Sequence, residues 1–250
     1  MDIDSYLKRI NFQQEIAVTK EVLFNLQRAH LLAVPFENLD IHYGTKIKLD
    51  LDAIYTKIVI KRRGGFCYEL NGLFFQLLKK IGFDVKIISA RVAAKDGKYG
   101  PEYDHLTIIA CVNNTNYLVD VGFGRFSYSP LEISLGVEIE DKFGTFNFDE
   151  YEGEYMRVNQ VEKEELIPQY IFKSHSIDFA AFEEICTYYQ TSPDSHFKQN
   201  KVISISTING RITLSANQLK ITKDGKEELI VFKEEEFEQK LMAYFDIRIN

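Results

Sequence analysis

The clearest hydrophobic pattern in the chain follows Cys67. Apolar residues recur there at spacings of three and four positions: Leu70, Leu73, Phe74, Leu77, Leu78 and Ile81. This spacing predicts a buried helix, and Gly82 is placed to end it. Because Gly64 and Gly65 stand just before Cys67, the helix is expected to begin at Cys67, directly after a glycine turn.

Two more helical patterns precede this helix. A segment that begins near Thr19 carries apolar residues on one face and is stopped by Pro35. Asp50 is placed to cap a shorter helix that runs to about Ile58. Three helices joined by short segments predict a helical bundle at the N-terminal end of the chain.

Beyond Val85 the apolar residues alternate or form short runs, which is typical of strands. Two runs, 106–112 and 117–121, flank the turn 113–116 and predict a β-hairpin. Later hairpins are expected to turn at Asn209-Gly210 and at residues 223–226, with one helix near 179–189 and a last one over 234–245. This order predicts an α+β protein with three subdomains.

Composition narrows the possible functions. The 250 residues carry a net charge of −7, which disfavours a nucleic-acid partner. No apolar run reaches the roughly 18 residues of a membrane helix, and the polar, acidic start does not resemble a secretory signal, so a cytoplasmic protein without a membrane partner is expected. The three cysteines are widely spaced and lack Cys-x-x-Cys or His-x-x-x-His patterns, so neither a disulfide framework nor a metal site is expected.

Cys67 is the first candidate for chemistry. The unpaired N–H groups at a helix start favour a negative charge, and the thiolate is the reactive form of cysteine. The position is therefore suited to a nucleophile. An inert cysteine in the core explains the same pattern equally well, because free cysteines are often buried.

The predicted hairpin supplies a base and a partner for that base. With a two-residue loop at Asn113-Asn114, His105 lies opposite Gly122, and His105 and Asp120 are diagonal neighbours on one face of the sheet. A four-residue loop keeps them on one face, whereas a three- or five-residue loop separates them. An aspartate beside a histidine fixes the tautomer of the imidazole, so Cys67, His105 and Asp120 form a candidate triad.

The segment Gly122-Phe123-Gly124 follows the hairpin directly. Two glycines around an aromatic residue permit a ligand to approach the backbone, with the ring as a pocket wall. A bend in the chain is the simpler explanation of the same pattern.

Three motifs together resemble one known family. The segments 63–71 (RGGFCYELN), 34–39 (VPFENL) and 120–125 (DVGFGR) are similar to signatures of the arylamine N-acetyltransferases, in the same order and at similar spacing. The segment 125–129 is shorter than in vertebrate members, which indicates the bacterial type. The resemblance implies a helical bundle over residues 1–84, a β-barrel domain with an interdomain helical segment over 85–190, and an α/β lid over 191–250.

The resemblance also implies an activity. Such an enzyme of xenobiotic metabolism transfers an acetyl group from acetyl-CoA to an arylamine, hydrazine or arylhydroxylamine, by a ping-pong mechanism through acetyl-cysteine. The Cys-His-Asp triad of the family falls on Cys67, His105 and Asp120. No metal is implied, and the partners are small molecules.

Secondary roles can be assigned on chemical grounds. Phe36 and Phe123 are candidates for an apolar slot that binds a neutral arylamine. The candidates for coenzyme A binding are Tyr99 and Gly100, in the loop before His105, together with Gly122 and Gly124. Arg63 and Glu69 are expected to form an ion or hydrogen-bond pair that holds the glycine turn.

Three other functions remain open at this point. A cysteine hydrolase uses the same triad, and triad chemistry alone does not choose between water and an amine as acceptor. An amide synthase of natural-product assembly is the second alternative. A non-catalytic scaffold is the third, and it requires that the three side chains do not meet.

Overall fold

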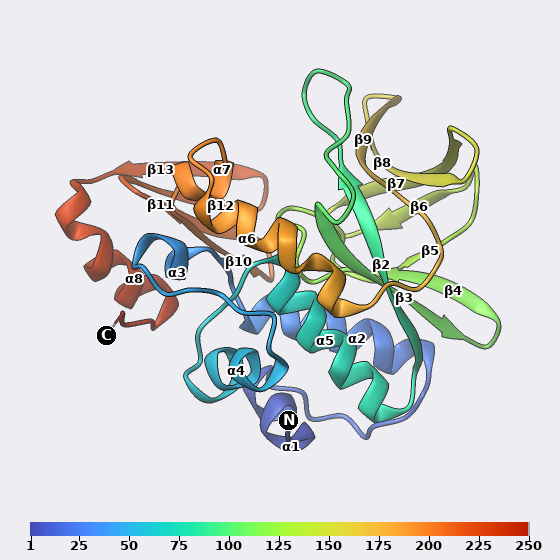
Figure 1. Cartoon of the computed structure of the whole chain (residues 1–250), viewed down its shortest axis with the longest axis horizontal. Coiled ribbons are helices and arrows are strands. Elements are labelled where there is room, and N and C mark those ends of the chain that lie inside the picture. The colour runs from blue at the N-terminus through green and yellow to red at the C-terminus, as the bar shows by residue number, and fades with distance from the viewer. Residues whose placement is uncertain (250) are drawn as a thin grey trace.

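The computed structural model describes residues 1–249. Its helical elements are α1 (Ile3–Arg9), α2 (Lys20–Ala33), α3 (Leu39–His42), α4 (Leu51–Tyr55), a π-helical turn (Thr56–Ile60), α5 (Cys67–Ile81), a 3₁₀ turn (Phe179–Phe182), α6 (Glu183–Thr191), α7 (His196–Gln199), a second 3₁₀ turn (Glu234–Glu236) and α8 (Phe237–Phe245). In Figure 1 the first helices lie at the bottom of the molecule, below two separate groups of strands.

The strands form two antiparallel sheets. The larger sheet has the order β5-β4-β3-β2-β9-β8-β7-β6 and the smaller has the order β1-β10-β11-β12-β13. Their bounds are β1 (Phe36–Glu37), β2 (Asp84–Val92), β3 (His105–Val112), β4 (Thr115–Val119), β5 (Leu131–Glu132), β6 (Glu138–Asp141), β7 (Gly144–Tyr151), β8 (Tyr155–Glu162), β9 (Glu165–Phe172), β10 (Val202–Thr207), β11 (Gly210–Ser215), β12 (Gln218–Lys223) and β13 (Lys226–Val231).

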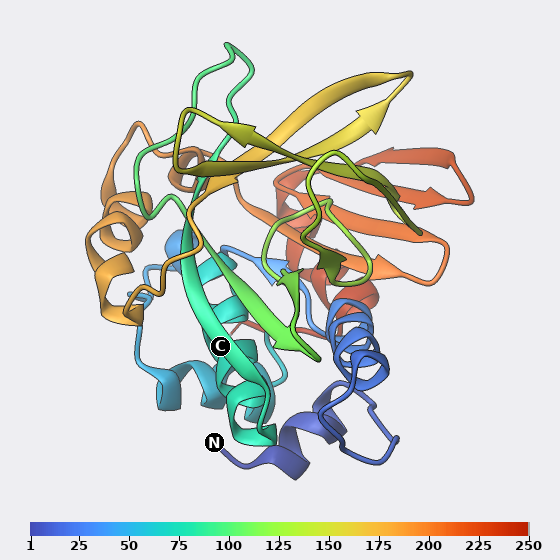
Figure 2. The ribbon, with the colours of Figure 1, turned by 90° about the vertical axis from the view of Figure 1, so that its right-hand side faces the viewer.

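The larger sheet curls into a nearly closed barrel. Figure 2 shows its strands crossing at steep angles above the helices. The segment after β5 returns to β7, where Leu135 bridges Phe148 and the Gly136 N–H donates to the Phe148 carbonyl at 2.8 Å. The interior is filled by apolar and aromatic side chains, among them Phe126, Phe146 and Tyr170. The α+β prediction, with a barrel-like middle part and an α/β C-terminal part, is confirmed.

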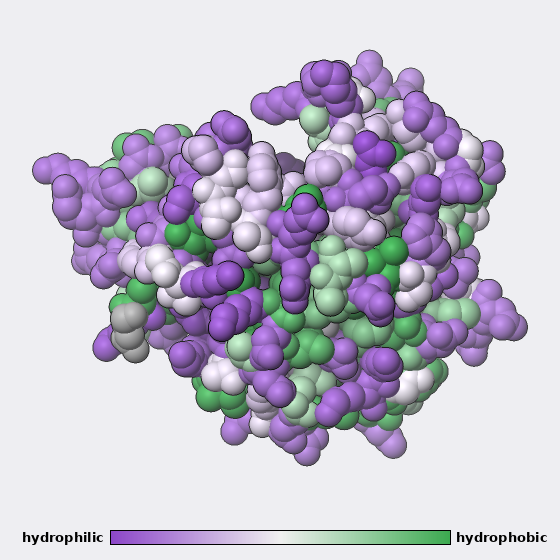
Figure 3. Space-filling view, in the orientation of Figure 1, coloured by the Kyte–Doolittle hydropathy of each residue, from purple (hydrophilic) through white to green (hydrophobic). Residues whose placement is uncertain are grey.

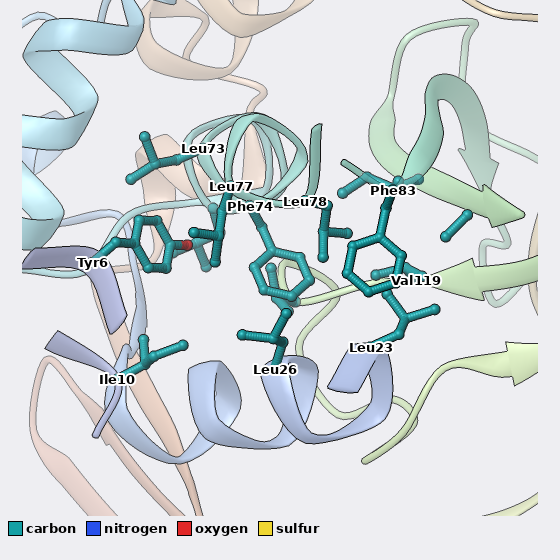
Figure 4. Close-up of a cluster of buried hydrophobic side chains, with 14 of the residues drawn as sticks. Tyr6, Ile10, Leu23, Leu26, Leu73, Phe74, Leu77, Leu78, Phe83 and Val119 are labelled. Atoms are coloured by element: carbon teal, nitrogen blue, oxygen red, sulfur yellow. The ribbon is translucent and has the colours of Figure 1, made fainter. Parts of the chain in front are cut away.

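The helix predicted after Cys67 is confirmed. It runs from Cys67 to Ile81, and Gly82 ends it at φ 111°, a left-handed conformation that favours glycine. Its apolar face packs against α1, α2 and the barrel. Figure 4 shows side chains of these elements converging on one core: Tyr6, Ile10, Leu23, Leu26, Leu73, Phe74, Leu77, Leu78, Phe83 and Val119. The predicted cap Asp50 accepts a hydrogen bond from the first turn of α4, and Thr19, near which the second helical segment was expected to begin, caps α2 in the same way.

The hairpin between β3 and β4 has the two-residue loop on which the triad prediction depends. Asn113 and Asn114 both adopt positive φ, as a tight hairpin turn requires, and Ile108 lies opposite Val119. The later hairpin turn predicted at Asn209-Gly210 is displaced by one residue. The β10–β11 turn lies at Ile208-Asn209, because Gly210 already pairs with Thr207.

The N-terminal segment also contributes to the smaller sheet. Phe36 of β1 pairs with Ser204 of β10, and Asn38 donates to the backbone carbonyls of Phe197 and Asn200. The helical region and the C-terminal sheet are therefore joined directly through the segment that precedes the glycine turn.

The outer face in Figure 3 is mainly hydrophilic, and a notch at the top separates the barrel from the C-terminal part. Within residues 1–249, none of the helices is both long and apolar enough to cross a membrane.

Candidate active site

Cys67 is the first residue of α5 and is only 4% exposed. The preceding residue, Phe66, is the N-cap, and its backbone N–H donates to the Glu69 carboxylate at 3.0 Å. This bond from the N-cap to the third helical residue is one half of a capping box and fixes the first turn of the helix. Cys67 is therefore held at a rigid helix start, as the sequence predicted.

The helix start was expected to favour the thiolate form of Cys67, but the rest of its surroundings disfavours that form. Burial raises the pKa of the Cys67 thiol, and the negative charges of Asp104 and Asp120 raise it further, although the backbone N–H of Tyr68 opposes this. The favourable effect of the helix start is outweighed because the thiol is almost fully desolvated. A nearby base is therefore needed before this thiol can ionise.

His105 and Asp120 meet in the structure. His105 Nε2 lies 2.7 Å from Asp120 Oδ2, and both residues are 2% exposed. A carboxylate only accepts hydrogen bonds, so Nε2 carries the proton and Nδ1 is left as the basic nitrogen. The pair lies at adjacent ends of β3 and β4 because the two-residue loop puts both side chains on one face of the sheet.

Asp120 accepts hydrogen bonds from five donors. Besides His105, these are the Asn71 amide at 2.9 Å, the backbone N–H groups of Gly122 and Phe123 at 2.9 Å each, and the Tyr170 hydroxyl at 3.1 Å. Burial alone would raise the pKa of Asp120, but His105, Asn71 and the Gly122 N–H outweigh it and lower the pKa overall. The carboxylate is thus kept ionised in a buried position.

Asn71 and Tyr170 were not predicted as site residues. Asn71 lies one helical turn after Cys67, and it joins α5 to β3 and to the segment after β4. Its amide nitrogen also donates to the Leu106 carbonyl at 2.6 Å, and its oxygen accepts from the Val121 N–H at 2.9 Å. The i, i+4 spacing from Cys67 was available in the sequence as a signal for Asn71. Tyr170 comes from β9, far along the chain, and no sequence pattern marked it.

The two glycines after Asp120 have different surroundings. A Cβ at Gly122 would lie 2.8 Å from the Cys67 Cα and 2.8 Å from the Asn71 amide nitrogen, so the segment after β4 can approach α5 this closely only with glycine here. Gly124 has no atom within 4 Å of its Cβ position and lines a cavity of about 670 Å³. Of the two, Gly124 is the one that faces open space.

Phe36 lines the same cavity as Gly124 and also packs in the cluster around Cys67. The ring of Phe123 packs 5.0 Å from the His105 ring and 5.1 Å from the Tyr170 ring, between centroids. Both predicted slot residues therefore lie beside the candidate triad, Phe36 toward the cavity and Phe123 against the imidazole.

Tyr99 and Gly100 lie apart from this cavity. The Tyr99 ring packs 5.0 Å from the Tyr151 ring of β7. A Cβ at Gly100 would collide with the Asp104 side chain, so packing within its own loop accounts for glycine at this position. The structure does not bring these two residues together with Gly122 or Gly124.

The predicted Arg63–Glu69 pair is wrong. Arg63 binds Glu37 at 2.7 Å and Asp40 at 2.9 Å, and Glu69 is instead bound by Lys57 at 2.9 Å. Lys57 also reaches Asp40 at 2.8 Å, so these five side chains form one buried ionic cluster. The pairing differs because the chain folds β1 back beside Gly65, which brings Glu37 rather than Glu69 to the guanidinium.

The comparisons with known proteins agree with one another. A family model described as N-acetyltransferase matches residues 19–250. The pineal gland arylamine N-acetyltransferase NAT-10 of Gallus gallus is 33% identical over all of this chain and 95% of its own length, and arylamine N-acetyltransferase 1 of Homo sapiens is 30% identical over the same shares.

Solved structures give the same result. An arylamine N-acetyltransferase of Mycobacterium smegmatis, in a form with one cysteine replaced by glutamine, superposes with a TM-score of 0.91 at 28% identity, covering 99% of this chain and 93% of that one. The Mycobacterium marinum enzyme, solved in complex with CoA, has a TM-score of 0.89 at 28% identity and covers 98% and 93%. The Bacillus cereus enzyme, described with a Cys-His-Glu catalytic triad, has a TM-score of 0.91 at 25% identity over both whole chains.

Sequence match and fold thus coincide along the whole chain, and the conclusion is that the protein belongs to the arylamine N-acetyltransferase family of acyltransferases.

Proposed function

We propose that this enzyme transfers the acetyl group of acetyl-CoA to the nitrogen of an arylamine, hydrazine or arylhydroxylamine, through an acetyl group carried on Cys67. The observation that carries the proposal is the buried His105–Asp120 pair, at 2.7 Å, which the Asn71 amide ties to the first turns of the helix that begins at Cys67. Membership of the arylamine N-acetyltransferase family supports an arylamine as the acceptor.

In the first half-reaction, His105 Nδ1 accepts the proton of the Cys67 thiol as the sulfur attacks the thioester carbonyl. Asp120 stabilises the resulting imidazolium through Nε2. The C–S bond to coenzyme A breaks, and the departing thiolate takes the proton from His105. Backbone N–H groups at the start of α5 are suited to stabilise the oxyanion.

In the second half-reaction, the amine nitrogen attacks the acetyl group on Cys67. His105 accepts the proton that the amine loses and returns it to the Cys67 sulfur as the thioester bond breaks. The apolar surroundings of Phe36 and Phe123 favour an acceptor that is neutral at pH 7, as arylamines are.

The test is to incubate the enzyme with radiolabelled acetyl-CoA in the absence of an acceptor. We expect one acetyl group on Cys67, located by mass spectrometry, and its release on addition of an arylamine or hydrazine. Cys67→Ser should carry no stable label, whereas Cys111→Ser, which alters a half-buried cysteine on β3, should label like the wild type. Absence of label on Cys67 would refute the proposal, and release to water as fast as to every amine would favour a hydrolase.

A further inference from the structure

The cavity beside Gly124 lies between the barrel and the smaller sheet. Its walls come from the loop after Asp120, from the turn between β6 and β7, and from β10, β11 and β12. Four cationic side chains line it, with Asp224 as the one acidic side chain among the lining residues: Arg125, Lys142, Arg211 and Lys220. In a protein with a net charge of −7, this is a local reversal of charge.

Arg211 is the most constrained of these cations. Its guanidinium donates to the Ser204 hydroxyl at 3.0 Å, the Ser206 hydroxyl at 2.9 Å and the Gly124 carbonyl at 2.8 Å. All three acceptors are neutral. A guanidinium has five N–H donors, so two remain uncommitted among the residues that the structure describes.

No carboxylate of residues 1–249 forms a salt bridge with Arg211, in contrast to Lys220, which pairs with Glu227 at 2.6 Å. Burial lowers the pKa of Arg211 to about 10, and the charge of Arg125 contributes to this shift. A half-buried guanidinium beside another cation is unfavourable unless an anion completes the site. The protein thus holds, at fixed geometry, a cation that lacks its counter-ion.

We propose that Arg211 is the residue that makes the enzyme specific for a phosphorylated acetyl donor, by binding a phosphate oxygen of the donor in the cavity beside Gly124. The inference rests on the proposed function, because it assigns the donor of that reaction a contact. Arginine is well suited to phosphate, since its hydrogen bonds to an anion are stronger than those to neutral groups.

The position of Arg211 also links the phosphate of the donor to the loop that supports Asp120. The guanidinium bonds to the carbonyl of Gly124, and the backbone N–H groups of Gly122 and Phe123 in the same loop bind Asp120. One side chain therefore contacts both the cavity and the loop that supports the candidate triad. A donor that engages Arg211 has its phosphate fixed relative to that loop.

The experiment assays each variant with two donors: acetyl-CoA and S-acetylpantetheine, which lacks phosphates. The variants are wild type, Arg211→Gln, Arg211→Lys and Lys163→Gln. Lys163→Gln is the control, because Lys163 is an exposed cation on the β8–β9 turn. We expect Arg211→Gln to raise the KM for acetyl-CoA by about 10- to 100-fold, the range for loss of a charged hydrogen bond. The KM for S-acetylpantetheine should change less than about twofold, because that donor has no phosphate to bind.

Arg211→Lys keeps the charge and should recover most of the loss for acetyl-CoA, while Lys163→Gln should behave as wild type. Equal losses with both donors would overturn the proposal, because Arg211 would then only support the loop. No loss with either donor would overturn it as well. Labelling of Cys67 by p-nitrophenyl acetate separates the two proposals: a variant that still labels retains the acetyl-cysteine chemistry whatever happens to donor specificity.

Discussion

Two buried charge networks lie at the start of α5, and they are built differently. In the first, the single carboxylate of Asp120 accepts five hydrogen bonds, and one of the donors is an imidazole. In the second, five charged side chains pair with one another: Glu37, Asp40, Lys57, Arg63 and Glu69. We call these the Asp120 network and the ionic cluster.

The difference lies in the kind of group that each network contains. Four of the five donors to Asp120 are amide or hydroxyl groups, and His105 is the one imidazole, a side chain suited to act as a base. In the ionic cluster every partner is a carboxylate, an ammonium or a guanidinium group that is paired with an opposite charge. Burial alone would lower the pKa of Lys57, but Glu69, Glu37 and Asp40 raise it overall. The first network is suited to orient a base and the second to hold the chain.

What the ionic cluster holds is the glycine turn. Glu37 accepts from the Leu39 N–H at 2.9 Å, and Glu69 accepts from the Phe66 N–H at 3.0 Å. A Cβ at Gly64 would lie 2.1 Å from the Pro35 carbonyl oxygen, so the turn also packs directly against the segment before β1. With similar burial, the Asp120 network is thus suited to chemistry and the ionic cluster to stability.

The largest effect is expected from Asp120→Asn. The amide cannot stabilise an imidazolium, and it presents an N–H where the site supplies only donors. We expect kcat to fall by about 10³- to 10⁴-fold, as when the aspartate of a related triad is neutralised. The measurement is single-turnover acetylation of Cys67, with thermal unfolding recorded in parallel to show that the protein is folded.

Asp120→Glu is the matched control, since it keeps the carboxylate and changes only its reach. The Bacillus cereus relative is described with a Cys-His-Glu triad, so we expect the glutamate variant to be more active than the asparagine variant. Activity of Asp120→Asn equal to wild type would show that the Asp120 network, like the ionic cluster, serves only stability.

The ionic cluster should respond in the opposite way. Lys57→Met leaves three carboxylates with one cation at a site where the lysine side chain is 12% exposed. We expect the free energy of unfolding to fall by about 3–5 kcal/mol, because uncompensated charges remain buried. Measured by urea unfolding, this loss should be partly reversed in Lys57→Met/Glu69→Gln, which removes one of the stranded charges.

The kcat of the folded Lys57→Met enzyme at low temperature should stay close to that of the wild type. A large loss of kcat with unchanged stability would contradict the distinction between the two networks. It would place the ionic cluster in the chemistry rather than in support of the turn.

Features of the fold and of the site that depend on local sequence signals could be predicted from the sequence. The α5 helix and the β3–β4 hairpin were predictable, because apolar spacing, Gly82 and the Asn113-Asn114 turn are local signals. The hairpin register in turn placed His105 and Asp120 on one face of the sheet.

Interactions between distant segments were not predictable in this way. Tyr170 reaches Asp120 from 50 residues further along the chain, and no periodicity marks such a contact. The Arg63–Glu69 pairing was wrong because it assumed that neighbours in sequence are partners, whereas the fold supplies Glu37 from 26 residues away. Arg211 is a further example, since its hydrogen bond to the Gly124 carbonyl joins β11 to the loop after β4.

The smallest effect is expected at Asp104, a carboxylate that belongs to neither network. It precedes His105 and accepts hydrogen bonds from the Tyr189 hydroxyl and, at 3.0 Å, from the Val92 N–H. After burial, its charge is the next cause of the raised pKa of the Cys67 thiol. Asp104→Asn removes a negative charge that opposes the thiolate, so the pKa of Cys67 should fall.

The measurement is the rate of alkylation of Cys67 by iodoacetamide as a function of pH. The profile of Asp104→Asn should move to lower pH, because a larger fraction of the thiol is ionised at each pH. Tyr189→Phe keeps the charge and removes only the hydroxyl, so its profile should not move in that direction. If the Asp104→Asn profile overlays that of the wild type, the charge of Asp104 does not set the pKa of the thiol, and burial together with the remaining neighbours of Cys67, Asp120 among them, accounts for the raised pKa.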